Sequence, residues 1–177
     1  VSGGAGIVTA DEAERIGLPM PPMPVDAQRR LKQILPYSSP ENPLDCPAQA
    51  LNDPSLLETF TRAALQDGGY GAVVCFFTYV AGSPAMVDTI VEAMRPLRAA
   101  YPDRIIAFCV LGAPDVLKRY DAEGILVFDD PCRAVRAIDA MLRRSTQPTP
   151  RPRPITQPVT LPSTTPDEAT AKTILSK

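Results

Sequence analysis

The sequence predicts a three-layer α/β fold with a doubly wound, mainly parallel sheet of about five strands. Three apolar runs, residues 72–78, 104–110 and 125–128, carry this prediction. Their hydrophobicity is continuous rather than alternating, which is typical of strands that helices cover on both faces. Helical patterns separate the runs, and right-handed crossovers between them give a flavodoxin-like layout.

Six helical patterns accompany these strands. Asp53 and Ser83 are expected to cap two of the helices, because their side chains accept hydrogen bonds from the first free amides and a proline follows each of them. Pro96 lies inside the second of these helices and is expected to kink or shorten it. Residues 20–23 are expected to form an edge strand or an extended segment, because prolines surround them. The predicted helices are 7–16, 25–35, 54–66, 84–100, 113–122 and 131–144.

A glycine-rich stretch, with Gly3, Gly4 and Gly6, precedes the first helical pattern. A turn of this kind normally follows a buried strand, at the sheet edge where α/β proteins bind ligands. Val1 and Ser2 are therefore interpreted as the end of a strand whose beginning is missing. The stretch lacks a complete dinucleotide or P-loop motif, so it is either an anion-binding turn or a plain strand-to-helix turn.

The composition changes sharply after Arg144. Residues 145–166 contain seven prolines and hardly any large apolar side chain, which predicts an extended linker. A single helix is expected over 167–175, and a helix of that length is not stable alone. The predicted organisation is therefore an α/β domain over 1–144, a linker over 145–166 and the start of a following region over 167–177.

The composition also excludes several functions. The chain of 177 residues has no histidine, so no Ser-His-Asp or Cys-His arrangement can form within it. A net charge of -2 gives no attraction to nucleic acid, and no apolar run approaches the ~20 residues of a membrane helix. The four cysteines are widely spaced, and Cys75 and Cys109 lie inside apolar runs, which favours small, buried, reduced thiols in a cytoplasmic protein.

Two pairs of polar residues lie in predicted loops. Asn42 precedes a proline and is expected to be extended, so that it and Asp45 either face the ligand edge of the sheet or satisfy the backbone of their own turn. Asp129 and Asp130 precede a helix and are interpreted as capping residues rather than metal ligands. No metal site is predicted.

The start of the longest predicted helix is a candidate phosphate site. Thr78 ends the most buried strand, and Gly82 and Ser83 precede the helix. The first amides of a helix and its positive dipole end suit a phosphate or a phosphorylated side chain presented from elsewhere. A plain capped helix is the alternative.

Several of these stretches together resemble the third module of the NDP-forming acyl-CoA synthetases. These proteins are single-chain relatives of succinyl-CoA synthetase and of ADP-forming acetyl-CoA synthetase. The resemblance spans Val1 to about Arg144, and residues 167–177 are similar to the entry helix of the ATP-grasp region that follows. The stretches that carry it are 1–11, 17–18, 42–45, 127–131 and 134–135.

The resemblance implies a division of labour within a longer polypeptide. An upstream domain binds coenzyme A, a second carries a histidine that is phosphorylated during turnover, and the downstream ATP-grasp region binds ATP and magnesium. Together they convert a carboxylic acid, CoA and ATP to acyl-CoA, ADP and phosphate. The fragment by itself is then inactive, binds no cofactor and contains no catalytic residue.

The module is expected to support the phosphohistidine of a neighbouring domain. Ala81-Gly82-Ser83 stands where the family has a double glycine. A non-catalytic flavodoxin-like binding or interaction module is the alternative function, and a homodimer through the exposed docking face stays open. The residues expected to face the phosphohistidine are Gly3, Gly4, Gly6, Gly82 and Ser83, with polar loop support from Asn42, Asp45 and Thr78.

Overall fold

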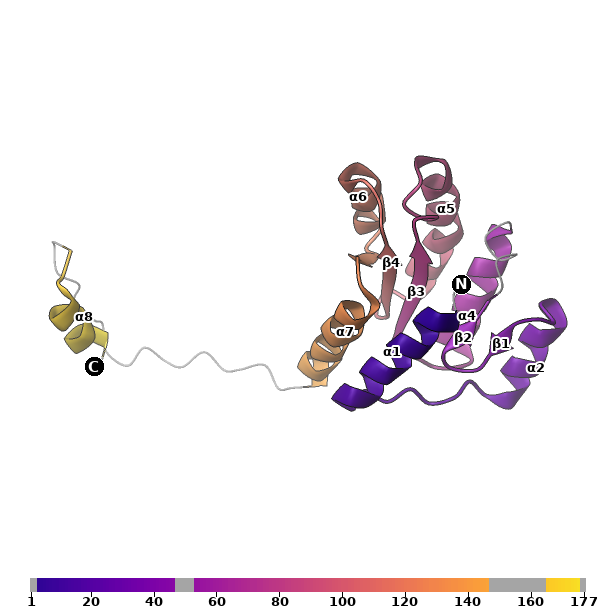
Figure 1. Cartoon of the computed structure of the whole chain (residues 1–177), viewed down its shortest axis with the longest axis horizontal. Helices are drawn as coiled ribbons and strands as arrows, with labels where there is room; N and C mark the ends of the chain where they lie inside the picture. Colours follow the sequence, from indigo (N-terminus) through magenta and orange to yellow (C-terminus); the bar gives the residue numbers. More distant parts are fainter. Residues whose placement is uncertain (1–2, 47–52, 147–164, 176–177) are drawn as a thin grey trace. The chain divides into compact units, whose positions relative to one another are not determined.

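The computed structural model describes residues 3–46, 53–146 and 165–175 (Figure 1). The predicted strand end at Val1 and Ser2 lies outside these residues, as does most of the predicted linker. In the part of the chain that is described, no helix is both long and apolar enough to cross a bilayer.

A three-stranded parallel sheet forms the centre of the α/β domain. It consists of β3 (Ala72–Thr78), β4 (Ile105–Val110) and β5 (Leu126–Phe128), with β4 in the middle. Ala72 lies opposite Ile105 in the register of the first pair. Helices connect the successive parallel strands, so the predicted α/β class and its flavodoxin-like layout are confirmed.

Two further strands form a separate antiparallel hairpin, β1 (Ser39–Pro40) and β2 (Leu44–Asp45). The five described strands are thus divided between two sheets, whereas the sequence predicts a single sheet of about five. Residues 20–23 belong to no helix or strand. The prolines in and around them remove the amide donors that a sheet ladder needs.

The helices agree with prediction to within two residues at each end, apart from the start of α1. Asp53 and Ser83 cap α4 and α5 as predicted, since their side chains accept hydrogen bonds from the amides of Ser55 and Ala85. The bounds are α1 (Gly3–Ile16), α2 (Val25–Ile34), α4 (Pro54–Gln66), α5 (Pro84–Ala100), α6 (Pro114–Ala122), α7 (Pro131–Thr146) and α8 (Glu168–Leu175).

Helix α1 begins at Gly3, so the predicted start at Ile7 is wrong and the glycines lie inside its first turns. The first amides of a helix have no partner within the helix, so small flexible residues are tolerated there. Gly6 also sits close to the hairpin, because a Cβ at this position would lie 3.1 Å from Cβ of Pro43. Close packing against Pro43 therefore accounts for a glycine at this position, and no turn is needed to explain it.

The main hydrophobic core lies between the sheet and helices α5 and α6. Phe108 is fully buried at its centre, and its ring meets those of Phe77 and Tyr120 edge to face, with centroids 5.0 and 5.2 Å apart. Helix α7 contacts all three strands, and α1 packs on α7. The sheet therefore has helices on both faces.

A second, smaller core joins α2, α4 and the hairpin. Met23, Leu31 and Phe60 are buried in it. It lies beside β3, away from β4, and Val73 of that strand contacts both cores. This cluster holds the hairpin and the segment before α2 against the domain.

Helix α8 belongs to a second unit. The contacts divide the chain into Val1–Thr146 and Gln147–Lys177. The helix forms where the sequence predicts it, and the Asp167 carboxylate accepts a hydrogen bond from the amide of Thr170 at 2.8 Å. This is an N-cap contact.

Candidate functional site

The structure divides the predicted site residues between two places. Thr78, Gly82 and Ser83 lie at the carboxyl end of β3, in the connection to α5. Asn42 and Asp45 lie on the hairpin and line a cavity beside β3, together with Gly6 of α1. Gly3 and Gly4 lie in the first turn of α1 and do not line that cavity.

The connection between β3 and α5 is a series of tight turns. The amide of Gly82 donates to the Tyr79 carbonyl at 3.1 Å, and that of Ser83 donates to the Val80 carbonyl at 3.2 Å. Thr78 has a φ of 54°, a left-handed conformation rare for a β-branched residue, so the strand ends abruptly there. The amides of Gly82 and Ser83 therefore donate their hydrogen bonds within the turn itself.

Gly82 lies where two loops touch. A Cβ at this position would overlap the Leu111 carbonyl oxygen and lie 2.9 Å from the Cα of Gly112. The Leu111 amide also donates to the Thr78 carbonyl at 2.9 Å. The loops after β3 and β4 are thus fixed against each other, and only glycine fits at their crossing.

The first turn of α5 has one amide with a weak partner. Ser83 Oγ accepts from the Ala85 amide at 3.4 Å, and the Ser83 carbonyl accepts from Met86 and Val87. Pro84 carries no donor. The Ala85 amide, at the positive end of a 17-residue helix, is therefore the donor best placed to meet an anion.

A buried tyrosine positions this helix start. Tyr120 Oη of α6 donates to the Ala81 carbonyl at 2.7 Å, and both residues have 0% exposed surface. Burial raises the pKa of Tyr120 to about 12, so the hydroxyl stays protonated and keeps donating. The sequence analysis missed this residue, whose only signal is its place on the apolar side of α6.

Two large apolar side chains are exposed in the crossing loops. Tyr79 is 73% exposed and Leu111 is 36% exposed. Each follows the carboxyl end of a parallel strand, the usual location of ligands and partners in α/β folds. This edge therefore presents a rigid, partly apolar surface beside the start of α5.

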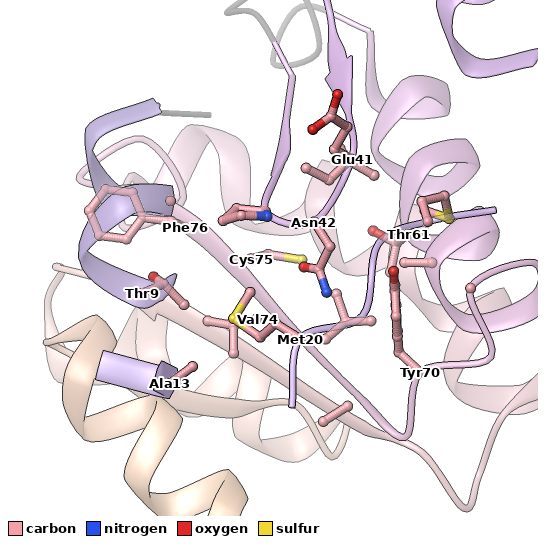
Figure 2. Close-up of a pocket in the computed structure, with 18 of the residues that line it drawn as sticks. Thr9, Ala13, Met20, Glu41, Asn42, Thr61, Tyr70, Val74, Cys75 and Phe76 are labelled. Carbon is pink, nitrogen blue, oxygen red and sulfur yellow. The ribbon is translucent and has the colours of Figure 1, made fainter. Parts of the chain in front are cut away.

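The second place is a cavity of about 750 Å³ along β3 (Figure 2). Its outer wall is held together at the Pro21 carbonyl. Asn42 Nδ2 donates to this oxygen at 3.0 Å, and Tyr70 Oη donates to it at 2.7 Å. Asn42 is thus a structural residue of the hairpin, and its peptide bond to Pro43 is cis.

The thiols near the cavity are not activated. Burial raises the pKa of Cys75 to about 11 and that of Cys46 to about 12, while Cys109 in the adjacent strand is also raised to about 12. Thiolates are the nucleophilic form of cysteine. These three residues therefore pack as small apolar side chains, as predicted for Cys75 and Cys109.

The acidic pair before α7 has a structural role. Asp130 Oδ1 accepts a hydrogen bond from the Arg133 amide at 2.8 Å, and Asp129 forms an ion pair with the Arg133 side chain. The predicted capping role is confirmed for Asp130 but not for Asp129, whose carboxylate bonds the Arg133 side chain instead. Within the described ranges, no three acidic or cysteine side chains are grouped to hold a metal ion.

One carboxylate of α1 has partners that the sequence analysis did not identify. Glu12 is 6% exposed and accepts hydrogen bonds from Arg15 at 2.7 Å and from Arg136 of α7 at 2.5 Å. Hydrogen bonds from Arg15 and then Arg136 lower its pKa from 4.5 to about 2. Its partner is 124 positions away, too far for any local pattern to reveal.

A solved structure, that of PH0766 from Pyrococcus horikoshii OT3, is similar to this chain. It covers 81% of the chain with a TM-score of 0.69 and 18% sequence identity. The match covers 34% of that protein, so the chain spans about a third of its length. No family model and no curated protein matches the sequence. A likeness at this identity shows a shared fold.

Proposed function

We propose that this chain is one module of an ADP-forming acyl-CoA ligase. The whole enzyme joins a carboxylic acid to CoA and converts ATP to ADP and phosphate. In this proposal the start of α5 meets a phosphohistidine supplied by a neighbouring domain. The resemblance over Val1 to about Arg144 supports it, and the flavodoxin-like fold is consistent with it.

The observation that carries the proposal is the fixed start of α5. The Gly82–Gly112 crossing and the Tyr120–Ala81 hydrogen bond hold it rigidly at the carboxyl edge of the sheet. The Ala85 amide and the helix dipole there favour a phosphorylated side chain. Because the chain contains no histidine, that side chain belongs to another domain.

The proposal gives this module no part in binding cofactors. The acidic residues of the described ranges are paired with arginines or spread apart, and they make no cluster suited to magnesium. In the proposed enzyme, ATP, magnesium and CoA bind to the other domains, as the resemblance implies.

The test is thioester formation by the parent polypeptide, with ATP, CoA and a panel of carboxylic acids. Ser83→Glu adds a negative charge where the phosphohistidine is proposed to sit, so we expect the rate and the amount of phosphohistidine to fall about tenfold or more. Ala99→Glu adds the same charge at the exposed far end of α5 and is the matched control. Its rate is expected to stay within about twofold of the parent's.

Two results would contradict the proposal. One is a folded Ser83→Glu parent with an unchanged rate. The other is a parent that forms no thioester although its upstream histidine is present. Either result favours the alternative, a non-catalytic flavodoxin-like binding module. This alternative is favoured by one observation, which is that the amides of Gly82 and Ser83 donate hydrogen bonds within their own turn.

A further inference from the structure

The segment that joins α1 to α2 is dense in prolines. Residues 19–24 read Pro-Met-Pro-Pro-Met-Pro and run along the outside of the domain between the two helices (Figure 1). Each of these residues is a proline, whose φ is fixed at about −65°, or precedes one and is restricted to extended values. Pro24 has φ −54° and ψ 137°, the values of a polyproline II helix. We call residues 19–24 the proline segment.

The burial of the proline segment follows the repeat of a polyproline II helix. Such a helix has three residues per turn, so Met20 and Met23 lie along one edge. Met23 is 2% exposed, and the half-buried Met20 lines the cavity beside β3, as Figure 2 shows. All four prolines are exposed, although Pro19 and Pro21 also border the cavity. The methionine edge therefore faces the domain, and the two proline edges are open to solvent.

Hydrogen bonds fix the proline segment at two points. Asn42 Nδ2 and Tyr70 Oη both donate to the Pro21 carbonyl, at 3.0 and 2.7 Å. Gln28 Nε2 of α2 donates to the Met23 carbonyl at 2.7 Å. A partner therefore meets a segment that is already ordered, which lowers the entropic cost of binding.

The exposed side of the proline segment offers acceptors and apolar rings. Within the part of the chain that the structure describes, no group donates to the carbonyl of Pro19 or of Pro22. The prolines have no amide donors. Val25, directly after the segment, is 59% exposed and adds to the apolar surface. The segment contains no charged side chain, so it gives no attraction to nucleic acid or to an anionic membrane.

The spacing of the prolines indicates the kind of partner that fits them. Pro19 and Pro22 are three positions apart, as are Pro21 and Pro24. Prolines at this spacing lie one turn apart on the same edge of a polyproline II helix. Domains that recognise this conformation bind it in grooves lined with aromatic side chains. The N–H of tryptophan and the O–H of tyrosine in such a groove can donate to free carbonyls of the ligand.

We propose that the proline segment is a docking site for a partner domain with an aromatic groove, of the kind that SH3 and WW domains have. The groove takes the two proline edges, while the methionine edge stays packed on the domain. This inference uses no residue of the proposed ligase site and is independent of that function.

Other prolines of the chain do not offer the same surface. Those over residues 148–166 are two or four positions from their neighbours, and no two of them are three positions apart. Pro40 and Pro43 of the hairpin have the right spacing, but Pro40 is fully buried. The proposal therefore assigns docking to residues 19–24.

The test titrates the isotopically labelled full chain with isolated SH3 and WW domains, followed by NMR. We expect at least one domain to bind and to shift the amide signals of Met20, Met23 and Val25, while those of β4 stay unchanged. The double variant Pro22→Ala/Pro24→Ala breaks both pairs and should weaken binding about tenfold or more. Both side chains are exposed, so the fold should be retained.

Two matched controls remove prolines elsewhere in the full chain. Pro102→Ala/Pro114→Ala removes two exposed prolines that have no proline three positions away. Pro152→Ala/Pro154→Ala removes two prolines of the stretch over 148–166. Each should bind the partner domain within about twofold of the unaltered chain.

A peptide of residues 18–25 keeps the test decisive if the double variant fails to fold. It carries both proline pairs and should compete with the full chain for the partner domain. The proposal is overturned if no domain shifts the signals of Met20, Met23 and Val25, or if the folded double variant binds as tightly as the unaltered chain. Absence of competition by the peptide overturns it as well. Loss of binding in Pro152→Ala/Pro154→Ala alone would assign the docking to residues 148–166 instead.

Discussion

At the scale of single residues, the crossing of the two loops after β3 and β4 depends on the missing side chain of Gly82. Gly82→Ala would place its Cβ 2.8 Å from the carbonyl carbon of Leu111, so the backbone of one loop must move. We expect the free energy of unfolding to fall by about 2–4 kcal/mol, measured by urea denaturation.

Gly71→Ala is the control for this substitution. Its Cβ would lie 3.5 Å from Cδ2 of Leu142, an ordinary van der Waals distance. The free energy of unfolding should therefore change by less than about 0.5 kcal/mol. Equal effects at the two glycines would show that the loop crossing does not contribute to stability.

Glu12 makes the free energy of unfolding of the domain depend on pH in the acidic range. Its carboxyl pKa lies near 2 in the folded chain against an ordinary 4.5, so ionised Glu12 favours folding above about pH 4.5. This contribution is lost progressively as the pH falls from about 4.5 through 2. Glu12→Gln should lower the denaturation midpoint at pH 7 and weaken its dependence on pH in this range.

Glu14→Gln is the matched control, because Glu14 is exposed on the same helix and no ion pair is found for it among the described residues. Its denaturation midpoint should follow that of the unaltered chain from pH 7 to pH 2. If the Glu12→Gln chain also follows it, the pair with Arg136 does not stabilise the fold.

At the scale of the elements, α5 continues through Pro96 to Ala100 instead of stopping early. Leu97, just after the proline, has 0% exposed surface and anchors the last turn in the core. Pro96 itself is exposed and cannot donate a helical hydrogen bond. Pro96→Ala should therefore raise the free energy of unfolding by about 1–2 kcal/mol, measured by denaturation.

Pro114→Ala serves as the comparison. Pro114 is the first residue of α6, where the missing amide has no helical partner in any case. The change in stability should be below about 0.5 kcal/mol. If the Pro96→Ala chain is no more stable than the Pro114→Ala chain, then Pro96 does not destabilise α5.

The elements also show how much of the fold the sequence could predict. β3 was predictable because its first six residues form an unbroken apolar run, and α4 and α5 because a capping residue and a proline mark each start. The hairpin was not, because strands of two residues have no period to detect. The predicted start of α1 was wrong because glycines usually indicate a turn.

The candidate site was predictable only in part. The sequence indicates that Gly82 and Ser83 precede a helix at the ligand edge, and they do. It could not show that their amides are used within the turn, or that Tyr120 holds the Ala81 carbonyl from 39 positions away. Nor could it place Asn42 on the hairpin. These are contacts between distant segments, which local patterns do not encode.

At the scale of the whole molecule, the described core residues all belong to the unit Val1–Thr146. Removing residues 147–177 should therefore leave the melting temperature of that unit within about 2 °C, followed by circular dichroism. A fall of more than about 4 °C would show that the second unit contributes to the stability of the first.

The packing of α1 on α7 has a consequence for the order of folding. β3, α5, β4, α6 and β5 follow one another along the chain and pack on their neighbours, so their contacts close short loops. The α1–α7 contact closes a loop of more than a hundred residues, as the Glu12–Arg136 pair shows. We expect φ-values near zero for substitutions in α1 and higher values in β4, which would make α1 the last element to dock.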